Sequence, residues 1–184
     1  MVDITGHLAF GLLFAVPAWF RWTDRASVAF IALAAVAALL PDIDLWLVRL
    51  FPAEVHHHGV THTVVFVTVA SLVGAAIVTG LFRRRIDEWI GHRRFDASRV
   101  FRFSFVAFLT GGLSHVFADV LSAPDISTPI EPFWPFFELP WTVDLVWYNA
   151  AWINSGFFAV MVLGHVVLAY LLTPVDRRDR LVPI

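Results

Sequence analysis

The sequence has no cysteine among its 184 residues. This absence excludes disulfides, thiolate nucleophiles and sulfur-ligated zinc, so any metal ion must be bound through nitrogen and oxygen. Lysine is absent as well, because all 13 basic side chains are arginine. A mechanism that proceeds through a lysine Schiff base is therefore excluded too.

Charged residues are also scarce. They make up 15% of the chain, against about 25% in soluble domains. Hydrophobic residues make up 59%, and the mean hydropathy is +0.74. This composition predicts an integral membrane protein with lipid as its partner. The net charge of -2 gives no basic face for nucleic acid, so no nucleic-acid partner is expected. Nothing in the composition indicates an oligomeric state.

The chain also lacks a linker rich in serine and glycine and any low-complexity run. We therefore expect residues 1–184 to form a single membrane-embedded domain. No basic segment precedes the first apolar stretch, so that stretch is expected to be a retained helix and not a cleaved signal peptide.

Five apolar segments are candidates for transmembrane helices. They cover residues 4–20, 26–40, 62–82, 103–121 and 151–172. A bilayer core about 30 Å thick needs about 20 helical residues, which the last three segments supply. The first contains Pro17 and the second is short unless it continues past Pro41, so either one alone could be re-entrant. The pattern predicts an all-α, polytopic helical bundle with about five spans.

The arginines predict the orientation of the bundle. If all five segments cross, 12 of the 13 arginines lie on one side, in three clusters. The clusters are Arg21 and Arg25; Arg83, Arg84, Arg85, Arg93, Arg94, Arg99 and Arg102; and Arg177, Arg178 and Arg180. Because cytoplasmic loops are enriched in arginine, the N-terminus is expected outside a cell (inner) membrane. An aromatic group would then lie at the outer interface, formed by Trp134, Trp141, Trp147, Tyr148 and Trp152.

With this topology, the outer ends of the first four helices carry most of the histidines and several aspartates. These residues are His7; Asp42 and Asp44; His56, His57, His58 and His62; and His115 and Asp119. An ionisable group at membrane depth needs a partner or a metal, because its insertion costs at least ~2.5 kcal/mol. We therefore expect a metal site at the outer ends of the first four helices.

Within this set the spacings leave alternatives open. His115 and Asp119 are four residues apart and share a helix face, as metal ligands or as a hydrogen-bonded pair. Asp42 and Asp44 follow Pro41, whose ring breaks the helix, so both carboxylates can face one cavity. They can equally cap a short helix that begins at Leu45.

The segment HHHGVTHT, residues 56–63, holds four histidines. His58 and His62 are four apart, whereas His57 and His62 share a target only if Gly59 bends the chain. The alternative to metal binding is a pH sensor, because clustered histidines titrate near neutrality.

Five ordered motifs carry a resemblance to a known family. They are Gly6-His7, Pro41-Asp42-Ile43-Asp44, His57-His58-Gly59-Val60-Thr61-His62-Thr63, Leu113-Ser114-His115-Val116-Phe117-Ala118-Asp119 and Pro132-Phe133-Trp134-Pro135-Phe136. Together, over residues 6–136, they resemble the YdjM-like family of LexA-binding, inner membrane-associated proteins, which are classed as metal-dependent hydrolases. That family usually has His-Arg-Gly-x-Thr-His-Ser in the third motif. The resemblance favours pairing His57 with His62 and leaves the role of His58, which stands in place of arginine, open.

The His115-x-x-x-Asp119 pair also resembles a motif of helical zinc-dependent phospholipases C and related nucleases. Residues and resemblance together predict a membrane-embedded hydrolase with one or two divalent ions, zinc first, although manganese, iron or nickel use the same atoms. The expected ligands are His57, His62, His115, Asp119, Asp42 and His7. Asp44 and Asp42 are the expected catalytic carboxylates, with Asp44 orienting a ligand or acting as a base.

The expected substrate is an ester or phosphoester in a lipid or a lipid-linked molecule, because the site lies at headgroup depth. Two other functions fit the same residues. One is transport of divalent metal ions or protons, which needs polar groups toward both faces of the membrane. The other is a non-catalytic regulatory protein whose helices are held together by metal.

Overall fold

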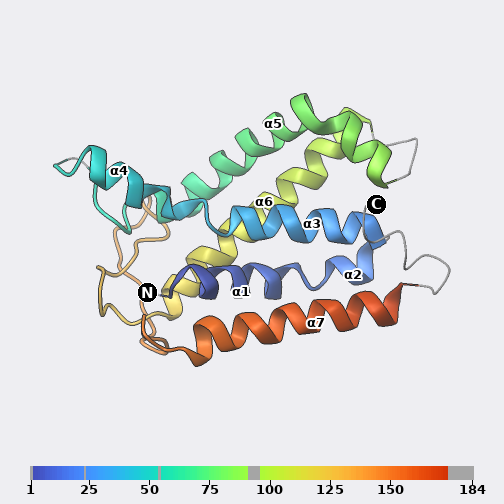
Figure 1. Cartoon of the computed structure of the whole chain (residues 1–184). Coiled ribbons are helices and arrows are strands. Elements are labelled where there is room, and N and C mark those ends of the chain that lie inside the picture. The colour runs from blue at the N-terminus through green and yellow to red at the C-terminus, as the bar shows by residue number, and fades with distance from the viewer. Residues whose placement is uncertain (1, 23, 54, 91–95, 174–184) are drawn as a thin grey trace.

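The helices of the protein lie side by side along one long axis (Figure 1). The computed structural model describes residues 2–22, 24–53, 55–90 and 96–173. Their α-helices are α1 (Ile4–Ala15), α2 (Ala18–Arg21), α3 (Asp24–Ala37), α4 (Asp44–Leu50), α5 (Val64–Ile90), α6 (Ala97–Leu121) and α7 (Phe157–Leu172). Shorter turns are η1 (Pro41–Ile43), η2 (Val60–His62) and η3 (Trp152–Gly156). No β-strand occurs within these ranges, and the prediction of an all-α fold is confirmed.

Five helical stretches of the described residues are long and apolar enough to cross a membrane. They are Ile4–Arg21, Asp24–Leu50, Val64–Ile90, Ala97–Leu121 and Trp152–Leu172. The first continues from α1 into α2 through the kink at Pro17, and the second continues from α3 through η1 into α4. Both of the segments that looked short in the sequence therefore reach the length of a span.

Helix α6 packs against α1, α3 and α5, and small residues allow it to approach them closely. A Cβ atom on Gly111 would lie 2.0 Å from the Ala34 carbonyl oxygen of α3, and one on Gly112 would lie 2.6 Å from the Val67 side chain of α5. Glycine is therefore required at both positions for the observed packing. The surface of α3 that faces α6 carries the small, fully buried side chains of Ala34 and Ala37.

Helices α5 and α7 present apolar side chains outward, as expected for surfaces that face lipid. The exposed residues include Val69, Val73, Ile77 and Leu81 on α5, and Val160, Leu163, Val167 and Leu171 on α7. Helix α7 is tied to the bundle by His165, whose Nδ1 accepts a hydrogen bond of 2.7 Å from Trp19. The Nε2 of His165 donates to the Leu12 carbonyl oxygen over 3.0 Å.

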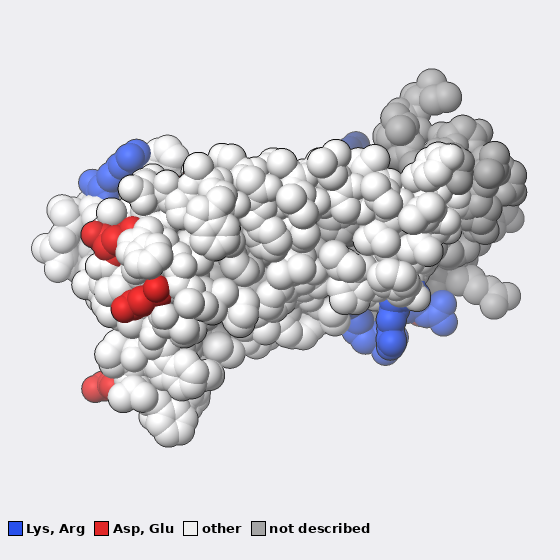
Figure 2. Space-filling model, turned by 90° about the horizontal axis from the view of Figure 1, so that it is seen from below, with Lys and Arg blue, Asp and Glu red and all other residues white. Residues whose placement is uncertain are grey.

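The two ends of the bundle differ in charge (Figure 2). Acidic side chains gather at one end and most of the visible basic side chains at the other. Arg49, in α4, belongs to the acidic end. The clustered arginines Arg93, Arg94, Arg177, Arg178 and Arg180 lie outside the described residues. At the acidic end the five tryptophan and tyrosine residues of the expected outer interface are all exposed.

Candidate metal centre

The acidic end of the bundle brings together the start of α1, the η1 turn, the loop before α5 and the end of α6. His7 lies in the first turn of α1, which Asp3 caps by accepting a hydrogen bond of 2.8 Å from the Gly6 amide. The backbone amide of Asp3 in turn donates to Asn154 Oδ1, over 3.1 Å. These contacts fix His7 at the end of the bundle rather than along its side.

Pro41 ends the regular part of the second span and turns Asp42 and Asp44 in different directions. Neither carboxylate caps a helix, because η1 and α4 have no side-chain cap hydrogen bond and begin after Leu40 and Ile43. Asp44 instead accepts a hydrogen bond of 2.9 Å from Thr61 Oγ1 and one of 3.2 Å from the His58 amide. The capping alternative is therefore wrong for both residues.

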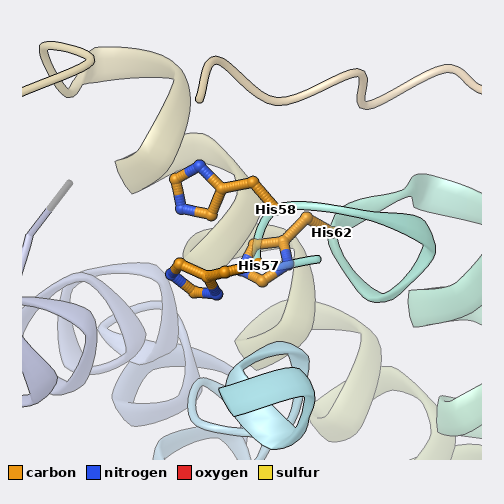
Figure 3. A group of neighbouring side chains, drawn as sticks. All are labelled: His57, His58 and His62. Atoms are coloured by element: carbon orange, nitrogen blue, oxygen red, sulfur yellow. The ribbon is translucent and has the colours of Figure 1, made fainter. Parts of the chain in front are cut away.

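The histidine loop folds back over the site so that three imidazoles gather (Figure 3). The ring centroids of His57 and His62 are 5.2 Å apart, and those of His58 and His62 are 4.7 Å apart. The chain turns at His57 and His58 and bends at Gly59, as expected, and His58 has a positive φ of 66°. A non-glycine residue adopts this left-handed conformation when its surroundings hold it. Here the His58 amide is bound by Asp44, and its Nδ1 by the Thr128 carbonyl oxygen.

Four potential ligand atoms converge at the centre: His62 Nε2, His115 Nε2, Asp42 Oδ1 and Asp119 Oδ2. The two nitrogens are 3.1 Å apart. His62 Nε2 lies 3.5 Å from Asp42 and 3.6 Å from Asp119, and His115 Nε2 lies 3.5 Å and 3.1 Å from the same two oxygens. A tetrahedral ion with bonds of about 2.0–2.1 Å separates its ligand atoms by about 3.3–3.4 Å. The five distances therefore lie close to the separation that one such ion requires.

Both histidines of this group are oriented through their other ring nitrogen. His115 Nδ1 donates to the Ala38 carbonyl oxygen over 2.7 Å, and His62 Nδ1 lies 3.2 Å from Asp44 Oδ2. Metal-binding histidines are characteristically held in this way, by a carbonyl or a carboxylate behind the ring. The arrangement points Nε2 of each ring at the shared centre.

Several polar atoms of the centre are buried and have no hydrogen-bond partner among the described residues. They are Asp42 Oδ1, both carboxylate oxygens of Asp119 and both ring nitrogens of His7. An unpaired buried polar group costs about 1–3 kcal/mol, and more if it is charged. Buried groups without a partner are rare in native proteins, and a bound ion is one of the explanations for them.

The electrostatics of the histidine loop also favour a cation at the centre. Burial lowers the pKa of His62, but the nearby carboxylates of Asp42 and Asp44 outweigh burial and raise that pKa to about 9. Burial lowers the pKa of His58 to about 4. The pKa of each of these two histidines therefore lies away from neutrality.

The remaining predicted ligands lie around the group of four. His7 Nε2 is 3.6 Å from Asp119 Oδ1 and 4.0 Å from Asp42 Oδ2. His57 Nδ1 is 2.9 Å from Asp44 Oδ1, so His57 reaches the centre through that carboxylate. His56 is exposed. His58, whose role the sequence leaves open, has its Nε2 3.9 Å from Asp119 Oδ2.

Sequence reasoning missed the groups that hold the histidines in place. Thr61 was visible as part of the third motif, but the hydroxyl's role depends on where the loop folds. The carbonyl oxygens of Ala38 and Thr128 carry no signal in the sequence, because every residue has one.

A cleft of about 860 Å³ opens beside the centre. One wall is the histidine loop, including His57 and His58, and the other is the segment from Ile126 to Glu131 with Trp134 and Pro140. The cleft therefore reaches the edge of the centre at His58, whose Nε2 lies 3.9 Å from Asp119 Oδ2.

The sequence model of a known family, described as YdjM inner membrane protein, matches residues 1–179. The chain belongs to the YdjM inner membrane protein family. Membership confirms the resemblance drawn from the five motifs, and with the five candidate spans it confirms a multi-pass protein of the inner membrane. The YdjM description names neither a reaction nor a protein partner. The chain matches no curated protein and no solved structure.

Proposed function

We propose that the protein is a membrane-embedded, metal-dependent hydrolase. The observation that carries the proposal is the group of four ligand atoms, with five mutual distances of 3.1–3.6 Å. In this proposal His62, His115, Asp42 and Asp119 bind a divalent ion. Zinc is the first choice because two imidazoles and two carboxylates at tetrahedral spacing suit it; manganese, iron and nickel accept the same donor atoms.

A divalent ion bound there, if its coordination expands to admit a water, would lower the pKa of that water toward about 7 and polarise the scissile group of the substrate. Asp44 holds the ring of His62 through its Nδ1; with its two oxygens occupied by His57, Thr61 and the His58 amide, it acts as an orienting carboxylate. Asp42 is the ligand that reaches solvent, since its side chain is 12% exposed and those of His62, His115 and Asp119 are fully buried. Asp42 therefore lies between the ion and the solvent.

The cleft supports an amphiphilic substrate. Much of its lining is apolar, including Val60, Ile126, Pro129 and Trp134, and Glu131 is the charged side chain of the lining outside the histidine loop. The exposed tryptophans of the same end of the bundle suit the membrane interface. An ester or phosphoester of a lipid or a lipid-linked molecule fits this position, with its polar group at the centre.

Transport of metal ions or protons has less support. A transporter needs ionisable groups along a path between the two faces. Among the described residues, His165 is the buried ionisable side chain outside the acidic end, and both of its nitrogens are hydrogen-bonded within the bundle. A centre confined to one end, beside a cleft, fits catalysis at the membrane surface.

The proposal is tested by metal analysis and a lipid hydrolysis assay on purified protein. We expect His62→Ala and His115→Ala to lose bound metal, measured by mass spectrometry, and to lose turnover on a panel of ester and phosphoester lipids. His56→Ala, which alters the exposed histidine of the same loop, is the matched control for metal binding and should retain the bound metal.

Two outcomes would contradict the proposal. Wild-type metal content in both variants would show that these histidines do not bind the ion. Full metal content without turnover of any lipid, combined with metal-dependent uptake into liposomes, would favour transport.

A further inference from the structure

We infer that the centre holds a second divalent ion, on the side of the carboxylates that faces His7. Its ligands are His7 Nε2, Asp119 Oδ1 and Asp42 Oδ2, so that both aspartates bridge the two ions. The inference rests on the first ion of the proposed function and adds the position at which water binds.

The ligands of the first ion leave it no open position. His62, His115, Asp42 and Asp119 supply four atoms to one tetrahedral ion, and four protein ligands are typical of closed, structural zinc sites. Catalytic zinc sites have three protein ligands and keep a position open for water. A hydrolase with this first ion alone would have no position for water unless the coordination expanded.

The first ion uses one carboxylate oxygen of each aspartate, and the other oxygen of each remains. Each aspartate directs one oxygen at His62 and His115 and the other at His7. Asp119 Oδ1, the oxygen that lies 3.6 Å from His7 Nε2, is buried and has no hydrogen-bond partner among the described residues. Carboxylates that place their two oxygens on different sides are suited to bridging a pair of ions, a common arrangement in hydrolytic two-metal sites.

His7 is buried and lacks hydrogen-bond partners in the described part of the chain. Its side chain is fully buried and neither ring nitrogen has a hydrogen-bond partner within the described ranges. His165 provides a contrast within the same bundle, because it is also buried but both of its nitrogens are hydrogen-bonded. His7 is therefore not a histidine satisfied by the core, and a metal ion would supply its missing partner.

The imidazole ring of His7 is held rigidly in place. The imidazole of His7 stacks on that of His115 with a centroid distance of 3.6 Å and an interplanar angle of 9°. On the other side of the helix turn, a Cβ on Gly6 would lie 2.5 Å from Asn154 Oδ1, so glycine allows η3 to close against α1 beside the histidine. The ring is thus fixed next to the first site, as a ligand of a neighbouring ion must be.

Three protein atoms at the second position leave coordination sites free. The two sites then differ in role: the four-ligand site holds α3, α6 and the histidine loop together, and the three-ligand site accepts water and substrate. His7 is a ligand of the site at which hydrolysis takes place.

Manganese loading tests the inference without relying on activity. The wild-type protein, freed of metal and titrated with Mn²⁺, should bind two ions per chain and give an electron paramagnetic resonance spectrum of exchange-coupled ions. His7→Ala should bind one ion per chain and give the six-line spectrum of isolated Mn²⁺. His165→Ala, the matched buried histidine outside the centre, should behave as the wild type.

The outcomes separate this inference from the proposed function. One uncoupled ion per chain in the wild type, lost in His62→Ala and unchanged in His7→Ala, would overturn the second site and leave the first intact. No bound metal in the wild type would overturn both. If His7→Ala does not fold, the stoichiometry and spectrum of the wild type still decide.

Discussion

His62 is the residue whose surroundings most directly favour a cation at the candidate centre. Its two ring nitrogens face different carboxylates, with Asp42 Oδ1 3.5 Å from Nε2 and Asp44 Oδ2 3.2 Å from Nδ1. These carboxylates outweigh the effect of burial and raise the pKa of His62 to about 9. In the metal-free protein His62 is therefore protonated at neutral pH, and an ion that binds through Nε2 must displace that proton.

We expect zinc binding to release about one proton per ion from His62 below pH 9, because metal ligands bind in their deprotonated form. Zinc affinity should then fall about tenfold for each unit of pH below 9, as expected for one displaced proton. Titration calorimetry in two buffers with different ionisation enthalpies measures the protons released.

Asp44→Asn is the informative control, because removing one carboxylate lowers the pKa of His62 toward its ordinary value. The variant should release less than one proton near neutral pH. Binding enthalpies that do not depend on the buffer would contradict a protonated His62 in the metal-free protein.

The sequence identified the residues of the centre better than their roles. From ligand chemistry and topology, the sequence predicted that Asp42, Asp44 and His57 lie at the same end of the bundle, where the structure has them. Which of the two aspartates faces the ion depends on the turn after Pro41, where a rotation of the backbone separates side chains only two residues apart. Local spacing does not specify that rotation, which is fixed by contacts with the distant histidine loop.

At the scale of elements, the contact between α3 and α6 determines the geometry of the centre. The hydrogen bond from His115 Nδ1 to the Ala38 carbonyl oxygen crosses this contact, and Asp42 follows α3 along the chain. Gly111 permits the close approach, since a Cβ there would lie 2.0 Å from the Ala34 carbonyl oxygen. The packing of two helices and the placement of two ligands thus depend on one glycine.

Gly111→Ala should therefore both destabilise the protein and weaken metal binding. Forcing an extra methyl group into a packed contact costs about 1–3 kcal/mol, and separating the helices would lengthen the bond from His115 to Ala38. Thermal unfolding in detergent and a zinc titration measure the two effects.

Gly80→Ala is the matched control, because no atom lies within 4 Å of a Cβ built at Gly80 in α5. It should leave stability unchanged or raise it slightly, since alanine is the better helix former by about 1 kcal/mol. Equal behaviour of the two variants would contradict the close packing of α3 and α6.

Helix positions followed from apolar length and from proline, but helix ends and backbone conformations did not. The first span contains Pro17, and α1 ends two residues before it. The bend expected at Gly59 is present, but the left-handed conformation of the loop lies at His58, with a φ of 66°. Intrinsic preference favours glycine for a positive φ, but the hydrogen bonds that His58 donates to Asp44 and Thr128 override that preference.

At the scale of the whole molecule, the charges and the site divide the bundle into two ends. The described arginines at 21, 25, 83–85, 99 and 102 belong to the ends of α2 and α5 and to the starts of α3 and α6, opposite the centre. Since arginine is enriched on the cytoplasmic side, the metal centre and its cleft should face outward. A substrate would then come from the outer leaflet of the inner membrane or from the space beyond it.

The absence of cysteine makes this orientation directly measurable. Single cysteines placed at Ser98, exposed in the first turn of α6, and at Glu138, exposed in the loop beside the cleft, report on the two ends. A maleimide that cannot cross membranes should label Glu138→Cys in intact spheroplasts and Ser98→Cys only after permeabilisation. The reverse pattern would turn the centre toward the cytoplasm and move its substrate to the inner leaflet. Labelling of both cysteines from outside would place Ser98 and Glu138 on the same side of the membrane. It would therefore contradict the single crossing by α6 that is expected to separate them.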